Sequence, residues 1–169
     1  MSGERFRLAR PSLVLVAFVA ALAALSVGPV AHPTAVNAGT AANMESKILG
    51  WINDARDNRG LRPLRVGDKL RNLAGDRATT MARTGDLEHP SCLGCLLENR
   101  DISYDTCGEA IAFTTWPWGH EAARSIFEGW RGSTLHWNLL MSPSYRRIGI
   151  GVAFRNSNDS TWAAAVLAG

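Results

Sequence analysis

The chain has 169 residues, of which 46% are hydrophobic and 20% charged, a length and composition typical of one globular domain. Its 18 basic and 15 acidic residues include no basic run interleaved with aromatic residues, which excludes nucleic acid as an expected partner. Its three cysteines are too few for a four-cysteine zinc site.

The first 38 residues predict export from the cell. Three arginines lie within residues 1–10, an uncharged apolar run follows from Ser12 to Val30, and small residues come next. This pattern is typical of a secretory signal peptide over residues 1–38, but the run is also long enough for an uncleaved membrane anchor. In either case we expect a secreted or extracellular domain that touches a membrane only through an uncleaved N-terminal segment. The segment holds three of the basic residues and one acidic residue, so the remaining 15 and 14 nearly balance.

Residues 39–46 are rich in small side chains and are expected to be a linker, with the folded domain spanning residues 47–169. Two amphipathic helices are predicted next, each ended by a glycine, Gly60 and Gly85. The apolar stripe of the first helix is Met44, Ile48, Ile52 and Ala55. The stripe of the second helix is Leu70, Leu73, Ala74, Ala78 and Met81.

A long loop is predicted over residues 86–106, and it contains two of the three cysteines. In an exported chain cysteines normally form disulfides, so we expect Cys107 to pair with either Cys92 or Cys95. The spacing of Cys92 and Cys95 also occurs in thioredoxin-like redox motifs. Such a motif opens a helix after a strand, however, whereas this one is expected in a loop.

The second half of the chain predicts a strand from Cys107, a helix from His120, a short helical turn before Pro143, and two final strands. A polar turn over residues 156–160 joins the last two strands. Because the helices come first and the hairpin last, the pattern indicates an α+β layered fold rather than alternating βαβ units.

Three polar residues are the candidates for a site: His89, Glu109 and His136. Strand alternation places Glu109 on the same face as Ile111 and Phe113. Two imidazoles and a carboxylate, if brought together, could hold a divalent metal with one open position, or form a hydrogen-bonded polar cluster in a cleft. Separately satisfied histidines are the third possibility. Ser133 could share a helical face with His136, but no orienting acid is evident for a catalytic pair.

Four segments, in order, resemble the CAP superfamily, whose SCP domain occurs in cysteine-rich secretory proteins, antigen 5 and pathogenesis-related proteins of class 1. The resemblance runs from about Lys47 to the C-terminus and is strongest to small secreted bacterial members. The segments that carry it are ILGWINDARDNRGLRPL, TGDLEHPS, CGEAIAF and EGWRGSTLHWNLLMSPSYRRIGIGVAF.

The resemblance implies a three-layer α-β-α sandwich with a central, mainly antiparallel sheet. It also implies a cleft formed by His89, Glu109 and His136. The chain departs from the family pattern at Ser133, where larger relatives carry another acidic residue. It also departs at Trp137, which makes the wall of the expected cleft more apolar.

We therefore expect a monomeric binding module without catalytic residues. Its predicted partner is a small apolar, lipid-like ligand or a cell-envelope component, bound by His89, Glu109, Ser133, His136 and Trp137. No cofactor is required by this hypothesis. The alternative is a peptidase-like hydrolase that depends on zinc or another divalent cation held by His89 and His136.

Overall fold

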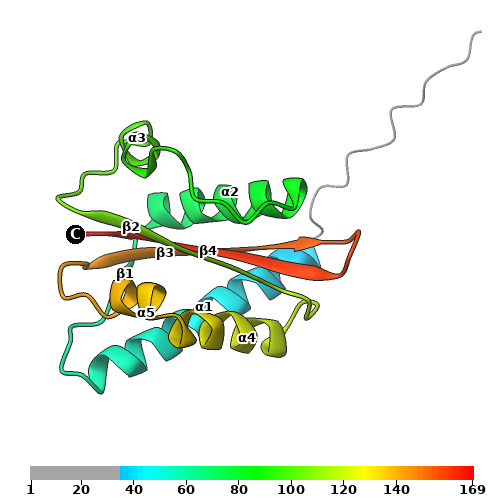
Figure 1. Ribbon diagram of the computed structural model, residues 1–169, viewed down its shortest axis with the longest axis horizontal. Helices are drawn as coiled ribbons and strands as arrows, with labels where there is room; N and C mark the ends of the chain where they lie inside the picture. The colour runs from blue at the N-terminus through cyan, green and yellow to red at the C-terminus, as the bar shows by residue number, and fades with distance from the viewer. Residues whose placement is uncertain (1–34) are drawn as a thin grey trace, which may run out of the picture. The chain divides into compact units, whose positions relative to one another are not determined.

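Helices cover both faces of a four-stranded sheet in the computed structural model, which describes residues 35–169 (Figure 1). This is the predicted three-layer α-β-α arrangement. The elements in chain order are α1 (Ala35–Asp57), β1 (Arg65–Val66), α2 (Asp68–Thr84), α3 (Leu93–Glu98), β2 (Cys107–Thr114), α4 (His120–Gly132), α5 (Thr134–Leu140), β3 (Arg147–Arg155) and β4 (Ser160–Ala168).

The sheet has the strand order β1-β3-β4-β2 and is mainly antiparallel, as predicted. Only the two-residue strand β1 runs parallel to its neighbour, β3. Strand β4 is central and buried along its whole length, because β2 and β3 pair with it on either side. Strand β2 is therefore an edge of the sheet, and the candidate residue Glu109 lies on it.

Two apolar cores separate the three layers. Helices α1, α4 and α5 lie on one face of the sheet, and α2 and α3 lie on the other (Figure 1). The alternation of β2 confirms the expected faces, since Ala110 packs with the first group of helices and Ile111 with the second. Each helix layer thus contributes its own side chains to the surroundings of β2.

Two glycines of β3 let α2 lie directly on the sheet. A Cβ atom at Gly149 would lie 2.0 Å from the carbonyl carbon of Leu70, and one at Gly151 would lie 2.2 Å from the amide nitrogen of Gly75. Both obstructing atoms are helix backbone, which cannot rotate away as a side chain can. The glycines of the IGIG segment therefore fix the distance between α2 and the sheet.

A buried arginine joins α1 to two other segments. Arg56 donates from Nε to the carbonyl oxygen of Arg62, at 2.8 Å, and from Nη1 to those of Leu140 and Ser142, at 2.6 and 3.1 Å. Burial lowers the pKa of Arg56, but three carbonyl acceptors satisfy its charge. Since Leu140 ends α5, Arg56 sets the position of the helix that carries His136.

The outer edge of β3 is partly covered by a carboxyl group. Beyond Val66, β1 no longer pairs with β3. There the Oε1 atom of Glu45, on α1, accepts a hydrogen bond from the backbone amide of Val152 at 3.3 Å. Burial raises the pKa of Glu45, although this bond and the charge of Arg71 act in the opposite direction.

The chain differs from the sequence-based expectation at two places. Residues 39–46, expected to be a linker, form part of α1, which begins at Ala35; Ala41 and Ala42 favour a helix, and Met44 is buried in the core. The expected loop over residues 86–106 contains the short helix α3, whose Leu97 is fully buried. Most of the predicted export segment, residues 1–34, lies outside the described residues.

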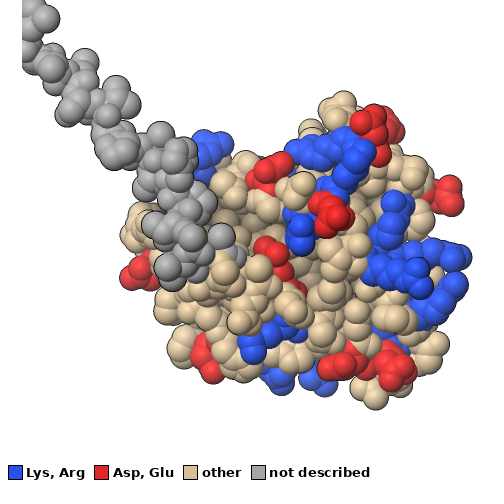
Figure 2. Space-filling view, turned by 180° about the vertical axis from the view of Figure 1, so that it is seen from behind, with Lys and Arg blue, Asp and Glu red and all other residues tan. Residues whose placement is uncertain are grey.

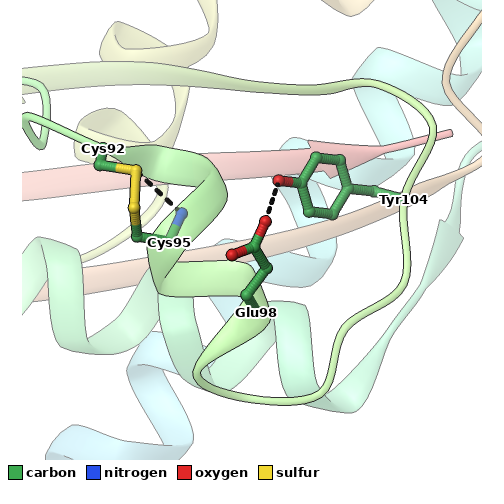
Figure 3. Close-up of a disulfide and its surroundings, with 4 residues drawn as sticks. All are labelled: Cys92, Cys95, Glu98 and Tyr104. Carbon is green, nitrogen blue, oxygen red and sulfur yellow. Dashed lines mark hydrogen bonds between the residues drawn. A yellow bond between two sulfur atoms is a disulfide. The ribbon is translucent and has the colours of Figure 1, made fainter.

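The predicted disulfide pairing is wrong. Cys92 and Cys95 are joined to each other, with 5.3 Å between their Cα atoms (Figure 3). Cys107 is a free thiol. The reason is α3, which begins just after Cys92 and brings residues three apart onto one side of a helical turn. Cys107 instead begins β2 and is half-buried against the core beneath α2.

Charged side chains of both signs cover the face in Figure 2, with the basic ones densest on one side. Many exposed charges in the described part of the chain form pairs, such as Arg71 with Asp68 at 3.3 Å and Arg124 with Glu128 at 2.8 Å. Within residues 35–169, no helix has the length and apolar character needed to cross a membrane.

The close approach of α2 to β3 predicts that Gly151→Ala destabilises the domain by about 3 kcal/mol, because the new methyl group must displace helix backbone. The free energy of unfolding, measured in guanidinium chloride, tests this. Gly129→Ala is the matched control, since Gly129 lies in α4 with open space around it. It should stabilise the domain by about 0.5 kcal/mol. Equal effects at the two positions would contradict the proposed contact.

Candidate functional site

The centre of the site is the carboxylate of Glu109, whose side chain is only 2% exposed. Arg77, on α2, donates from Nε to Oε1 at 2.7 Å and from Nη2 to Oε2 at 3.4 Å. The same Nη2 atom also bonds to the carbonyl oxygen of Glu88. A buried carboxylate needs such a partner to offset its lost hydration, and Arg77 supplies it inside the fold.

His89, in the segment that follows α2, also contacts the Glu109 carboxylate. Gly85 ends α2 in the left-handed conformation, with φ of 86°, and its amide donates to the carbonyl oxygen of Met81. The chain then turns back toward β2, and His89 Nδ1 lies 2.9 Å from Oε2 of Glu109. The carboxylate orients the ring, while 56% of the His89 side chain remains exposed. Its Nε2 atom is therefore available to a ligand.

His136 comes from the opposite helix layer. It lies on α5, which contacts β2 on the face opposite α2, and it is half-buried. Burial lowers the pKa of His136, and the charge of His89 lowers it further. His89 and His136 thus approach β2 from opposite helix layers, His89 through its contact with Glu109 and His136 through α5. At neutral pH the His136 ring is uncharged and offers one donor and one acceptor.

Among the described residues, Ser133 and Trp137, also predicted to line the cleft, make no hydrogen bond or ring contact with His89, Glu109 or His136. Ser133 precedes α5, and its side chain makes no capping hydrogen bond. Trp137 lies in a separate groove between α1 and α4, where its ring centroid is 6.1 Å from that of Phe127. Adjacent residues on a helix point about 100° apart, so the side chains of His136 and Trp137 leave α5 in different directions.

The groove around Trp137, here called the aromatic groove, combines aromatic rings with arginines. Its rings belong to Trp51, Phe127 and Trp137, and Trp51 lies 5.6 Å from Phe127. The guanidinium of Arg59 lies 5.2 Å from the Trp137 ring, and that of Arg124 lies 5.3 Å from the Trp51 ring. Such an arrangement favours ligands with an apolar body, and the arginines favour an anionic or polar end.

The residues of the site do not fit a three-ligand metal centre. Both oxygens of Glu109 already accept hydrogen bonds from Arg77, and one also faces His89. The Nδ1 atom of His89 is used in the same contact. Across the described part of the chain, no three His, Cys, Asp or Glu side chains are grouped so that they could hold a metal ion. Only the Nε2 atom of His89 and the ring of His136 remain as donors.

Arg77 is the functional residue that the sequence analysis missed. It lies four residues after Leu73 and four before Met81, so it continues the apolar stripe of α2. A charged residue at an inward position requires a buried partner of opposite charge. The position of Arg77 within the apolar stripe could therefore have been read from the sequence. Once α2 is placed against the sheet, Glu109 of β2 is the acidic partner that it meets.

A family model described as the cysteine-rich secretory protein family, CAP, matches residues 49–166. Among curated proteins, YkwD of Bacillus subtilis is 27% identical over 111 residues, which are 63% of this chain and 41% of that protein. The chain therefore spans less than half the length of this relative.

Solved structures show the same fold. An extracellular protein of Bacillus anthracis with an SCP domain aligns over 76% of this chain and 41% of its own, with a TM-score of 0.65 and 18% identity. An outer surface protein of Borrelia burgdorferi aligns over 75% of this chain and 92% of its own, with a TM-score of 0.64 and 18% identity. At this identity the likeness concerns the fold alone.

Glu109→Gln should destabilise the domain by about 3 kcal/mol, because it leaves the largely buried Arg77 without a counter-charge. Glu128→Gln is the matched control, since Glu128 pairs with Arg124 on the surface, and should cost less than about 1 kcal/mol. Unfolding in guanidinium chloride at neutral pH measures both values. A loss at Glu109 no larger than the loss at Glu128 would show that the buried pair does not hold the site.

The lowered pKa of His136 predicts a specific pH dependence. Because the folded chain holds this proton less tightly than the unfolded chain, protonation favours unfolding. The stability should therefore fall as the pH drops through the unfolded pKa of about 6.5 toward the lower folded value. Glu45, whose pKa is raised, acts in the opposite direction just above its unfolded pKa.

The difference between the wild type and His136→Gln isolates this contribution, since Glu45 is common to both chains. Denaturant unfolding between about pH 7.5 and about pH 5.5 should show a shallower loss of stability in the variant. Parallel pH profiles would show that His136 is equally basic in both states.

Proposed function

Since the chain belongs to the cysteine-rich secretory protein family, CAP, we propose that it is an extracellular binding domain without catalytic residues. The ligand that fits best is small, with an apolar body and a polar head, as in a lipid-like molecule of the cell envelope. The names of its structural neighbours, one extracellular and one from an outer surface, support a location outside the cell.

The observation that carries this proposal is the full engagement of Glu109. General base catalysis needs a carboxylate or imidazole directed at a substrate, a nucleophile or a water molecule. Here the carboxylate is directed at Arg77 and His89 instead. Moreover, within residues 35–169 no hydroxyl or thiol is hydrogen-bonded to His89 or His136, so the site lacks an activated nucleophile.

What remains is a good arrangement for recognition. Glu109 orients the His89 ring, and the ring of His136 is uncharged at neutral pH. Together they offer hydrogen bonds to a polar head group. The aromatic groove offers apolar surface on the other side of α5, with Arg59 and Arg124 over its rings. His136 and Trp137 lie on α5, which Arg56 ties to α1, and the Glu109 carboxylate orients His89, which favours binding without a large rearrangement.

The alternative, a hydrolase that uses zinc or another divalent cation, has weaker support. A catalytic zinc normally has three protein ligands and an open position. His89 and His136 supply two donors, and the third candidate, Glu109, is already bound to Arg77. We therefore propose that no cation is required for ligand binding. Zinc titration by calorimetry on the wild type and on His136→Ala tests this separately.

Ligand binding is tested with a fluorescent long-chain fatty acid as the probe and the full chain as the protein. Trp137→Ala should weaken binding by about tenfold or more, because it removes one wall of the aromatic groove. His136→Ala should weaken binding of a probe with a polar head more than that of a plain hydrocarbon probe. Extraction of the purified protein with organic solvent, followed by mass spectrometry, identifies any natural ligand.

Leu135→Ala is the matched control, since Leu135 lies on the same helix and is 83% exposed. It should leave the affinity unchanged. Equal affinity of Trp137→Ala and Leu135→Ala would show that the aromatic groove is not the binding surface. Hydrolysis of an ester or peptide library that depends on His136 and on added zinc would replace the binding proposal with the hydrolase.

A further inference from the structure

Two exposed cysteines on α3 carry chemistry that ligand binding does not use (Figure 3). Cys92 directly precedes the first helical residue, and Cys95 lies one turn further along the helix. We propose that Cys92 and Cys95 form a redox-active pair that exchanges two electrons with external disulfides and thiols. Contrary to the sequence-based expectation, the motif opens a helix, as redox-active cysteine pairs of this spacing commonly do.

The disulfide between Cys92 and Cys95 contributes little to the stability of the fold. A cross-link stabilises a fold mainly by restricting the unfolded chain, and this effect grows with the length of the closed loop. Here the joined cysteines are only three residues apart, within one turn that the helix already forms. The bond therefore connects no two distant parts of the domain, in contrast to the predicted bridge to Cys107.

Other contacts keep α3 in place when the bond is open. Leu97 is fully buried in the core between α2 and the sheet. The hydroxyl of Tyr104 donates to Oε1 of Glu98 at 3.1 Å (Figure 3), and Arg100 pairs with Asp76 of α2 at 2.8 Å. Reduction of the disulfide should thus leave the helix folded, as a reversible redox cycle requires.

The turn between the two cysteines is also held by packing. A Cβ atom at residue 94 would lie 2.5 Å from the hydroxyl oxygen of Tyr104, so a larger residue there would have to displace this ring. The tyrosine covers the helix at Gly94, between the two sulfur-bearing residues. The helical geometry that brings the cysteines together therefore persists in the dithiol form, and the bond can close again.

The two sulfur atoms are not equivalent. The backbone amide of Cys95 donates a hydrogen bond to Sγ of Cys92 at 3.1 Å (Figure 3). In the dithiol form this donor stabilises a thiolate on Cys92, and no comparable donor to Cys95 is present among the described residues. Cys92 is therefore the nucleophile of the pair, and Cys95 resolves the mixed disulfide.

The exchange is balanced in two steps. The Cys92 thiolate attacks one sulfur of an external disulfide, forms a mixed disulfide and releases the other half as a thiolate. The Cys95 thiolate then attacks Sγ of Cys92, closes the internal bond and releases the second half. Two electrons pass from the protein to the external disulfide, and the two protons lost by the cysteines end on the released thiols. An external dithiol drives the reverse reaction.

The third cysteine, Cys107, provides an internal control for the thiol–disulfide exchange. Cys107 is half-buried at the start of β2, and burial raises the pKa of its thiol. It therefore stays protonated and is a poor nucleophile. Cys107→Ser should leave the exchange unchanged, whereas serine at either position of the pair should alter it in a distinct way.

The experiment uses the reduced full chain and oxidised glutathione as the probe, with alkylation and mass spectrometry of the products. The wild type and Cys107→Ser should each close the Cys92–Cys95 bond and release both halves of one glutathione disulfide. Cys95→Ser should stop at a mixed disulfide on Cys92. Cys92→Ser should react about tenfold more slowly, because Cys95 lacks the backbone donor.

Three results would overturn the proposal. Equal rates for Cys92→Ser and Cys95→Ser would remove the assigned nucleophile. A wild-type rate no faster than that of a short peptide containing CLGC would show that the fold does not increase the reactivity of the cysteine pair. Loss of the folded state on reduction, or in the double variant Cys92→Ser/Cys95→Ser, would show by circular dichroism that the disulfide is a structural bridge.

Discussion

The contact of α2 with β3 at Gly149 and Gly151 is the constraint on which the rest of the domain depends. Helix backbone lies where the side chain of any other residue would be. This close approach sets the thickness of one layer, and with it the reach of Arg77 to the buried carboxylate of Glu109. A small outward shift of α2 would lengthen that ion pair and leave two charges poorly solvated. The packing of two glycines is therefore a condition for the site.

The opposite wall of the site has its own anchor. Arg56 binds the carbonyl oxygen of Leu140, which ends α5, and so ties the helix of His136 and Trp137 to α1. The two histidines thus come from layers that are positioned by different buried arginines, one paired with a carboxylate and one with carbonyl groups. The sheet lies between the two layers, and β2 carries Glu109, the carboxylate that bonds to both Arg77 and His89.

Apolar periodicity in the sequence predicted the main helices and the three longer strands, and the family resemblance implied the three layers. The predictions were wrong where contacts between distant parts of the chain determine the local structure. Helix α3 exists because Leu97 finds a buried place, which no local pattern reveals, and that helix redirects the disulfide. Of the predicted site residues, the structure joins His89 to Glu109, whereas the spacing did not reveal that Trp137 lines the aromatic groove with Trp51 and Phe127.

The carboxyl group of Glu45 at the outer edge of β3 has a consequence for solubility. An edge strand with free amide groups is a template for pairing with another chain, and an inward charge is a common defence against such aggregation. Glu45 places its side chain on the amide of Val152, beyond the point where β1 ends. Since burial raises the pKa of Glu45, its carboxylate is protonated at a higher pH than that of an exposed glutamate. Acidification therefore weakens the protection of this edge, where edge-to-edge association between copies would begin.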